Sequence, residues 1–500
     1  MRALLLLFFA FLASSNAARA GGIVWHPWSD TVFQQAHREH KFVLLDLEAV
    51  WCHWCHVMDE TTYRDPSVVA LVESHYIAVK VDQDSRPDIS NRYEDYGWPA
   101  TVVFGPDGGE IVKRQGYFKP AEMASILRAI VKDPSPGPSV EPEKELKFGA
   151  ASRLAPALRD DLQRRFEDSY DSKHGGWGTG QKFLDWNCVE YAMLRSQSGD
   201  HKAELMARET LAQQRKLIDP VWGGVYQYSV GGDWDQPHFE KIMAFQANDL
   251  RIYALAYQQW KDPADLQSAR EIARYLRDFL TSPEGSFYTS QDADLIDGKH
   301  SADYFKLDDA ARRSKGIPRI DRHRYARENG WAIAALATLY QVTKDQADLD
   351  AAVRAANWVV ANRAIPGGGF RHDVKDEAGP YLDDTLAMGR AFLTLYDGTG
   401  EIAWLQAAEA AAEYCRANFP GEAAGFVTAK PAEGLRYPPA PERDENINMA
   451  RFASALFRVT KNERYQQMGE QAMRYLVEPS IARQAPTAGV LLAAREMDGQ

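Results

Sequence analysis

Hydrophobic and polar positions divide the chain into two regions with different periods. Up to about residue 132, short apolar runs at 42–47, 76–81 and 101–104 alternate with amphipathic stretches, which predicts strands buried in a sheet with helices between them. From about residue 146 onward, apolar residues recur at i, i+3 and i+4, which predicts one helix after another. The pattern therefore indicates an α/β domain followed by an all-α domain.

The first region contains start and turn signals that order its elements. Ser29 can cap a helix that places Val32, Phe33 and Ala36 on one face. Pro106-Asp107-Gly108-Gly109 predicts a hairpin turn. The expected order is helix, strand, helix, helix, strand, β-hairpin and helix, with helices at 29–39, 52–63, from 66 and at 120–132, and the last strand at 110–116.

The second region predicts about twelve helices, and aromatic glycine-rich turns separate pairs of them. The turns lie at 175–177, 223–226, 285–288, 367–370 and 425–426. Their recurrence at roughly 50–80 residues suggests helical hairpins that close into a ring. The expected helices are 153–168, 186–198, 202–218, 243–260, 263–281, 326–342, 346–363, 383–397, 402–418, 445–460, 462–477 and 483–495.

The two ends of the first domain are marked by composition. Arg2, a short apolar run and Ala18-Arg19-Ala20 predict a signal peptide over 1–20, so we expect a periplasmic or secreted protein; an uncleaved anchor is the alternative. No later stretch has 18 uninterrupted apolar residues, so no membrane span is expected in the mature chain. Prolines predict an extended linker over 134–144, which leaves domains at 21–133 and 145–500.

Charge and cysteine content narrow the classes of function. The chain of 500 residues has a net charge of −12 and no long Lys/Arg run, which argues against nucleic acid as the main partner. Its four cysteines are too few for a disulfide scaffold in a chain this long. Any cysteine chemistry is therefore expected within a short motif rather than in a network of disulfides.

Cys52-His53-Trp54-Cys55 is the strongest chemical motif, because it follows a buried strand and opens a helix. A thiol with a pKa near 8.5 is only about 3% ionised at pH 7, and backbone N–H groups at a helix N-terminus stabilise the thiolate. A nearby protonated His53 or His56 acts in the same direction. We predict that Cys52 is the nucleophile and that Cys55, one turn on, resolves by closing a disulfide; inert packing cysteines are the alternative. The scheme requires a pair that is close enough to bond and open to solvent.

Two residues outside the motif support this hypothesis. Asp46 lies on the buried strand six residues before Cys52, where burial raises the pKa of a carboxyl, so it could take the proton from Cys55 through a water. An Asp hydrogen-bonded at a strand edge is the alternative. A cis Trp98-Pro99 bond before the 101–104 strand would leave backbone free to pair with a substrate segment, unless Pro99 is an ordinary strand-start residue. Trp54, Trp98 and Pro99 are the expected substrate contacts.

Other chemistries compete for the same residues. Cys52-x-x-Cys55-His56 also spells a c-type haem attachment site in a secreted chain, with His56 as the proximal ligand. The strand that precedes the motif disfavours this interpretation, because a haem crevice is usually wrapped by helices. A zinc site completed by His53 or His56 is also weak, since Cys188 and Cys415 are lone residues in apolar helices. No cofactor or metal is therefore expected.

The order Asp46, Trp51-Cys52-His53-Trp54-Cys55 and then Pro99 resembles the thioredoxin fold. The longer string 52–58 is similar to the thioredoxin-like family of spermatogenesis-associated proteins and their bacterial YyaL-type relatives. Three later segments also match the family: Gly175-Gly176-Trp177-Gly178, Pro237-His238-Phe239-Glu240-Lys241-Ile242-Met243 (PHFEKML in the family) and Phe287-Tyr288-Thr289-Ser290-Gln291-Asp292-Ala293-Asp294 (FYSAEDAD in the family). The sequence departs from the family pattern at 298–301 and 328–330. The resemblance implies a thioredoxin fold joined to an (α/α)6 toroid like those of sugar epimerases and six-hairpin glycosidases.

The loops between the toroid helices carry carboxylates and histidines that could bind a ligand. His238, Glu240, Asp292 and Asp294 are the candidates, although such residues also serve as helix caps and turn formers. We therefore expect a thiol–disulfide oxidoreductase that acts on protein or small-molecule thiols and disulfides, with the toroid binding its substrate or partner. The alternative is a carbohydrate-binding or carbohydrate-modifying toroid in which the first domain is regulatory or structural.

Overall fold

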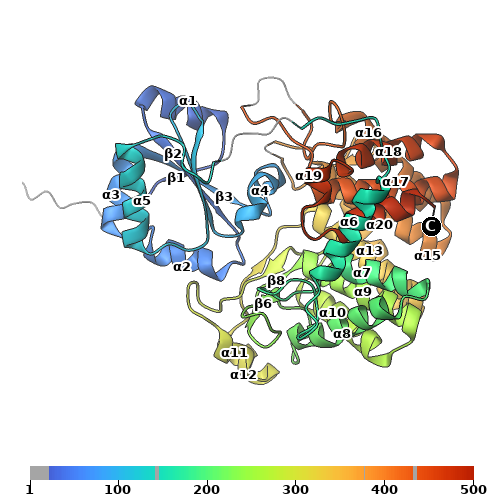
Figure 1. Ribbon diagram of the computed structural model, residues 1–500. Helices are drawn as coiled ribbons and strands as arrows, with labels where there is room; N and C mark the ends of the chain where they lie inside the picture. Colours follow the sequence, from blue (N-terminus) through green and yellow to red (C-terminus); the bar gives the residue numbers. More distant parts are fainter. Residues whose placement is uncertain (1–21, 141–145, 377, 432–435, 500) are drawn as a thin grey trace, which may run out of the picture.

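The computed structural model describes residues 22–140, 146–376, 378–431 and 436–499. The predicted signal peptide and part of the predicted linker lie outside these residues. Figure 1 shows an α/β domain, in blue, beside a larger helical domain that runs from green to red. The two-region prediction from the periodicity is confirmed.

The first domain is built on a five-stranded sheet in the order β1-β3-β2-β4-β5. β2 runs parallel to β3 and antiparallel to β4, so Asp46 has Lys80 and Thr101 as its neighbours across the sheet. This is the topology that the resemblance to thioredoxin implied. The strands are β1 (Trp25–His26), β2 (Phe42–Glu48), β3 (Tyr76–Asp82), β4 (Ala100–Phe104) and β5 (Glu110–Gln115).

Alternate residues of the buried strands pack against helices on opposite faces of the sheet. Val43, Leu45 and Leu47 of β2 face α1 (Asp30–Glu39) and α4 (Pro87–Tyr93). Leu44 faces the other layer, which is formed by α2 (His53–Thr61), α3 (Pro66–His75) and α5 (Pro120–Lys132). A short 3₁₀ helix, η1 (Glu94–Tyr96), follows α4. Burial on both faces explains why β2 reads as an unbroken apolar run.

The helical domain is a ring of six helical hairpins. The inner helices contact one another in the closed order α7, α9, α13, α15, α17, α20 and back to α7. An outer helix packs on each of them: α8, α10, α14, α16, α18 and α6, respectively. The (α/α)6 toroid implied by the family resemblance is confirmed.

The toroid helices agree closely with those predicted from the sequence. The first and last helices of the domain, α6 and α20, pack against each other and so close the ring. Leu162 and Phe166 of α6 and Val490 and Leu492 of α20 belong to one hydrophobic core. The helices are α6 (Pro156–Asp168), α7 (Trp186–Gln197), α8 (His201–Gln214), α9 (Met243–Trp260), α10 (Pro263–Phe279), α13 (Ala326–Thr343), α14 (Gln346–Arg363), α15 (Leu382–Thr399), α16 (Ile402–Asn418), α17 (Arg443–Thr460), α18 (Glu463–Leu476) and α20 (Ala488–Met497).

Some local features differ from the sequence-based expectations. The two-residue strand β1 and the helix α4 were not predicted, and neither were the short helices α11 (Ala302–Phe305), α12 (Asp309–Lys315) and α19 (Pro479–Ala482). Ser29 occupies the N-cap position of α1 but makes no capping hydrogen bond, because its hydroxyl bonds Thr31 instead. Elements this short lack a full period of the hydrophobic pattern, so periodicity does not reveal them.

The α/β domain lies against the loops at the N-terminal ends of the inner helices. In Figure 1 its helix α4 faces the toroid. Tyr437, from the loop before α17, packs into the core around Phe33 and Phe104, and Asn91 of α4 donates a hydrogen bond to Glu445 of α17 over 3.2 Å. No helix in the described part of the chain is long and apolar enough to cross a membrane.

Candidate functional site

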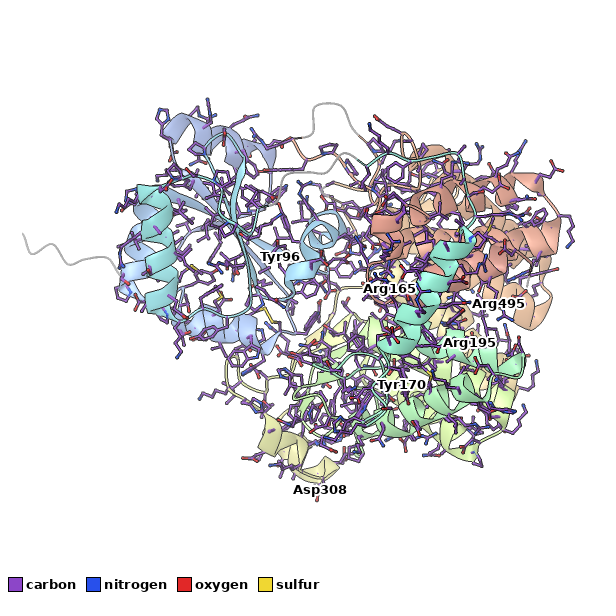
Figure 2. All side chains as sticks on the ribbon, viewed as in Figure 1. Tyr96, Arg165, Tyr170, Arg195, Asp308 and Arg495 are labelled. Carbon is purple, nitrogen blue, oxygen red and sulfur yellow. A yellow bond between two sulfur atoms is a disulfide. The ribbon has the colours of Figure 1, made fainter. Side chains whose placement is uncertain are left out.

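Cys52 and Cys55 are joined by a disulfide at the start of α2, visible as a yellow bond near the edge of the α/β domain that faces the toroid (Figure 2). Cys52 is the N-cap of α2, and its sulfur accepts the backbone N–H of Cys55 over 3.2 Å. A free sulfur at this position would receive the same N–H and the positive end of the helix dipole. The predicted placement at a helix N-terminus is confirmed.

The pair is covered by the toroid. Only 4% of Cys52 and 2% of Cys55 is exposed. Both cysteines pack in a small apolar cluster with Ile242, which ends the β8 strand (Lys241–Ile242), and Phe245 of α9 packs against that cluster. The cysteines are close enough to bond, as exchange requires, but the expectation that they are open to solvent is wrong, because a toroid segment lies over them.

The aromatic residues expected beside the pair divide between solvent and interface. Trp54 is 41% exposed and stacks on Tyr117 at a centroid distance of 5.6 Å. Trp98 packs on the cysteine cluster, and the Trp98–Pro99 bond is cis, as the sequence suggested. Trp54 is thus the one of these residues that offers a large free surface next to the motif.

Asp46 is a buried residue of β2, and it shares the ammonium group of Lys80 with two other carboxyl groups. Burial raises its pKa to about 6, although Lys80, with Nζ 3.3 Å from Asp46 Oδ2, opposes the rise. Glu48 and Asp59 lie 2.8 and 2.6 Å from the same Nζ. The predicted rise in the pKa of Asp46 is confirmed, whereas its role as the proton acceptor of Cys55 stays a prediction.

The two histidines of the motif bind a carboxylate from the toroid. His53 Nδ1 lies 2.8 Å from Asp294 Oδ1, and His56 Nδ1 lies 3.4 Å from Asp294 Oδ2. Burial raises the pKa of Asp294, but the bonds from both imidazoles outweigh it and hold the pKa below its ordinary value. Gly298, at a φ of +72° that suits glycine, adds its N–H to Asp294 over 2.9 Å.

Asp292 supports the contact between the toroid and the cysteine motif through Arg319. Arg319 Nη2 donates to Asp292 over 3.0 Å and to the carbonyl of Val50 over 2.6 Å, just ahead of the cysteine motif. Burial lowers the pKa of His56, but the bond to Asp294 and the charge of Asp292 more than offset it, so the pKa lies above its ordinary value. Asp292 and Asp294, considered above as ligand contacts of the toroid loops, therefore lie against the cysteine helix.

The segment with His238 and Glu240 also lies at the domain interface. His238 stacks on Tyr228 at 4.4 Å. Glu240 is buried, and its Oε2 has no hydrogen-bond partner among the described residues but lies 3.9 Å from His238 Nδ1. The adjacent Lys241 is fully buried in an ion pair with Asp219 at 2.8 Å. This pair fixes the β8 backbone, so that the next residue, Ile242, covers the disulfide.

Two groups of described residues have ligand atoms close enough together for a metal ion. They are His56, Asp292 and Asp294, and Asp46, Glu48 and Asp59. A protein cation already serves each group: Arg319 contacts Asp292 in the first, and Lys80 contacts all three carboxyls in the second.

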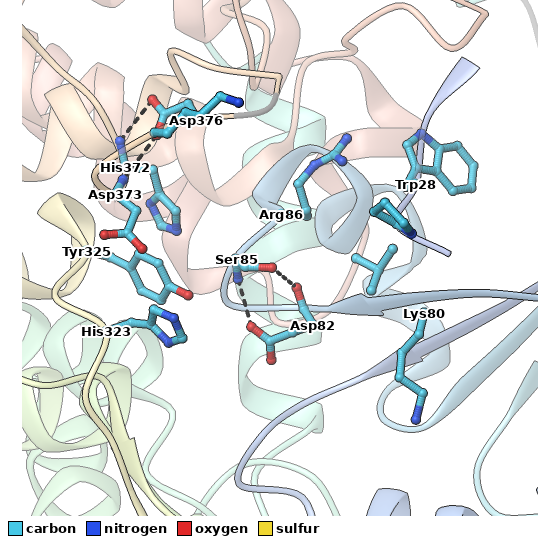
Figure 3. A pocket seen from close by; sticks show the side chains of 13 residues that line it. Trp28, Lys80, Asp82, Ser85, Arg86, His323, Tyr325, His372, Asp373 and Asp376 are labelled. Carbon is cyan, nitrogen blue, oxygen red and sulfur yellow. Dashed lines mark hydrogen bonds between the residues drawn. The ribbon is translucent and has the colours of Figure 1, made fainter. Parts of the chain in front are cut away.

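A second chain of contacts connects the motif to the toroid. Trp51 donates its indole N–H to Asp84 over 2.8 Å, and the backbone carbonyl of Asp84 lies 2.6 Å from His372 Nε2. His372 Nδ1 is 2.8 Å from Asp384, and its ring stacks on Tyr325 at 4.0 Å. Figure 3 shows His372, Tyr325 and His323 facing the loop with Asp82 and Ser85, across a cavity of about 270 Å³.

The His372–Asp384 pair predicts a pH dependence of stability. Burial lowers the pKa of His372, but Asp384 outweighs it and raises the pKa to about 9. Because the folded pKa lies above the unfolded value near 6.5, the contribution is complete below about pH 6.5 and is lost as pH rises toward 9. The loss should be of the order of 2–3 kcal/mol.

Urea unfolding at pH 6.5 and 9.5 measures this effect, with His372→Gln as the variant that cannot titrate there. His323→Gln is the matched control, since His323 also has a pKa raised to about 9, by its hydrogen bond to Asp321, but its side chain is 53% exposed. An equal fall in stability for the wild type and His372→Gln would contradict the assignment to His372.

Several residues of the site were not singled out in the sequence. Arg319, Asp84 and Ile242 have ordinary local contexts, and their roles come from contacts between domains that sequence spacing does not encode. The PHFEKIM and FYTSQDAD segments did carry a signal, because both matched the family resemblance. The structure explains that match, since both segments contact the cysteine motif.

Comparisons with known proteins agree with this architecture. Residues 14–132 match the family model Thioredox_DsbH, described as a protein of unknown function, DUF255. Spermatogenesis-associated protein 20 of Homo sapiens is 27% identical over 305 residues, which cover 54% of this chain and 39% of that protein. The thiol:disulfide interchange protein DsbD of Colwellia psychrerythraea is 28% identical over 105 residues, or 20% of this chain and 17% of that one.

Solved structures match the toroid. Cellobiose 2-epimerase from Bacillus thermoamylovorans superimposes with a TM-score of 0.50 at 9% identity, covering 69% of this chain and all of the enzyme's, which supports the fold alone. The chain spans about two-fifths of the length of the first curated relatives that it matches, 42% and 39%. With a redox-type domain, a bonded cysteine pair and a six-hairpin toroid, the chain is similar to the thioredoxin-like family of spermatogenesis-associated proteins.

Proposed function

We propose that the protein is a thiol–disulfide oxidoreductase that works outside the cytoplasm and whose toroid controls access to the Cys52–Cys55 pair. The observation that carries the proposal is the disulfide itself, at the N-terminus of α2. The signal-peptide pattern of residues 1–20 supports the location, and the name of the DsbD relatives supports thiol–disulfide interchange.

The exchange follows from the sulfur geometry. A partner thiolate attacks Cys52 Sγ, a bond forms between the two sulfurs, and the Cys52–Cys55 bond breaks with its electron pair on Cys55. Cys55 then takes up a proton, and we assign its donor to Asp46, a buried carboxyl on β2 with a pKa near 6. A second partner thiolate attacks the partner sulfur of the mixed disulfide, and the bond from that sulfur to Cys52 breaks with its electron pair on Cys52, so that the partner is oxidised and the pair is reduced. The reverse sequence reduces a partner disulfide.

The sulfurs differ in their suitability for attack. Cys52 Sγ accepts the N–H of Cys55, a contact that stabilises negative charge on Cys52 rather than on Cys55. A stabilised thiolate is the better leaving group, as Cys52 is when the second partner thiolate attacks, and it is ionised at a lower pH, which favours Cys52 as the nucleophile in the reverse sequence. We therefore assign the mixed disulfide to Cys52.

The toroid acts as a cover in this proposal. Partner thiols need a path to Cys52, and Ile242 and Phe245 occupy it in the described conformation. Exchange therefore involves displacement of the β8 segment from the cysteine pair.

Trapping of a mixed disulfide tests the proposal. In Cys55→Ser, oxidised glutathione or a partner protein disulfide should form a stable adduct on Cys52, which intact-mass measurement detects. Cys188→Ser is the matched control, because Cys188 is a buried free cysteine far from the motif in sequence, and it should leave exchange unchanged. If Cys55→Ser forms no adduct with either probe, even when the domain interface has been loosened as described in the Discussion, the proposal is wrong.

A further inference from the structure

The axis of the toroid holds a second polar cavity, separate from the cysteine pair. Its volume is about 200 Å³. Five of the six inner helices line it, and Asn91 and Glu94 of the α/β domain lie over its mouth. The toroid residues that line it are Trp186, Asn187, Ala244, Asn248, Arg251, Arg327, Trp331, Asp383, Arg390, Glu442, Asp444, Glu445, Ile447, Asn448 and Arg451.

Three arginines form the floor of this cavity at one depth. Arg251, Arg390 and Arg451 are each the ninth residue of their helix, in α9, α15 and α17. Because these inner helices start at the same end of the ring, the ninth positions lie at a similar height, about 12 Å along each axis. The floor is therefore a cluster of guanidinium groups.

Carboxylates balance only two of the three guanidinium groups. Glu190 accepts from Arg251 at 2.7 Å and from Arg451 at 2.7 Å, and Glu496 accepts from Arg451 at 3.0 Å. Arg390 donates to the neutral amide of Asn448 at 2.6 Å and has no ion-pair partner in the described ranges. One positive charge on the floor is thus left over.

The electrostatics of Arg390 agree with this count. Burial, together with the charges of Arg451 and Arg251, lowers its pKa to about 10, so the group is still a cation at neutral pH. Asp383 is on the same helix, but seven residues earlier, which is about 10 Å along the axis. Asp383 therefore lies nearer the mouth and does not pair with Arg390 at the floor.

The walls are suited to a ring with hydroxyl groups. Trp186 and Trp331 contribute aromatic surface, which packs against the C–H face of a sugar ring. The amide of Asn187 and the carboxyl of Asp383 both line the cavity, and neither forms a hydrogen bond with a described residue. Ligand cavities for drug-sized molecules are typically about 300–1,000 Å³, so this smaller one fits a ligand about as large as a monosaccharide.

We propose that the axial cavity binds a small polyhydroxylated carboxylic acid, whose carboxylate pairs with Arg390 and whose ring lies between Trp186 and Trp331. The planar guanidinium has free N–H groups beside the one that Asn448 uses, and it matches a carboxylate in two-point geometry. A neighbouring cavity of about 650 Å³, which shares Asn91, Glu94 and Glu442 with this one, provides the approach from the domain interface. This site does not depend on the cysteine chemistry.

Calorimetric titration of the full chain tests the proposal with three probes: D-glucuronate, D-glucose and D-glucose 6-phosphate. Glucuronate should bind, and glucose, which has the same ring without the acid, should bind at least tenfold more weakly. In Arg390→Gln the affinity for glucuronate should fall at least tenfold, to the level of glucose. Arg464→Gln, at an exposed position on α18, is the matched control and should bind like the wild type.

A second variant keeps the test valid if Arg390→Gln folds poorly. Arg390→Lys keeps the charge but loses the planar fork, and we expect an intermediate affinity together with an unchanged circular dichroism spectrum. Equal binding of glucuronate and glucose, or glucuronate binding that survives in Arg390→Gln, would overturn the assignment of the acid to Arg390. Exclusive binding of the phosphate would overturn the carboxylate assignment, and absence of binding by all three probes at millimolar concentration would overturn the site.

Discussion

Glu190→Ala is expected to lower the free energy of unfolding by about 3–5 kcal/mol, because it removes one partner of a buried ionic network. Glu190 is 9% exposed and accepts two hydrogen bonds from each of Arg251 and Arg451. Burial raises the pKa of this carboxyl, but the two guanidinium groups overcome the effect and hold it far below its ordinary value. Without the carboxylate, the three arginines of the cavity floor repel one another in a site largely shielded from water.

Chemical unfolding followed by circular dichroism measures this loss. Glu60→Ala is a matched control, because Glu60 makes an exposed pair with Arg64 on one face of α2, and such pairs contribute only about 0.3–0.5 kcal/mol. A similarly small change for Glu190→Ala would mean that α7, α9 and α17 do not depend on the shared carboxylate. High concentrations of a carboxylate ligand should partly restore the variant if the anion replaces Glu190.

Asp294→Ala is expected to speed the reduction of the Cys52–Cys55 disulfide by dithiothreitol about 10–100-fold. Hydrogen bonds to charged groups contribute about 1.5–3 kcal/mol, and each 1.4 kcal/mol corresponds to a factor of ten in the population of the open state. Asp294 contacts both histidines of the motif, so its loss should loosen the toroid segments that cover the sulfurs. The rate is followed by quenching the reaction with a thiol-alkylating reagent and measuring the mass.

Asp303→Ala is the control for this variant. Asp303 lies on α11, close in sequence, but its side chain is 98% exposed and it pairs only with Lys306. The global stability of both variants should be measured, so that a faster reaction caused by general unfolding is recognised. If the reduction rate of Asp294→Ala equals that of the wild type in a fully folded protein, the toroid does not limit access to the disulfide.

The sequence predicted the regular elements well because each toroid helix has a full hydrophobic period. The helices at 243–260, 346–363 and 402–418 were predicted with the bounds that the structure has. Helix ends elsewhere differ by a few residues, as in α15, which starts at Leu382 and continues to Thr399. Local periodicity carries this information, so it is available without tertiary structure.

Only the part of the candidate site that lies in the α/β domain could be predicted, because the residues that cover the cysteine pair come from the toroid. Cys52, Cys55 and Asp46 follow from local chemistry and from the position of the motif after a buried strand. The burial of the pair by Ile242 depends on how the toroid meets the α/β domain, and no spacing rule encodes that contact. The arginine cluster could have been found, because Arg251 and Arg390 stand at the same distance from the starts of their predicted helices, to within one residue.

Pairing of α6 with α20 makes closure of the ring depend on contacts between distant parts of the chain. Thr487 donates a hydrogen bond to the carbonyl of Leu162, and Arg159 pairs with Asp498 at 2.7 Å, so residues more than 320 positions apart meet at the seam. The ring is closed only when α20 has docked between α7 and α17. A folding intermediate without this contact therefore exposes the apolar faces of α7 and α17, where aggregation can begin.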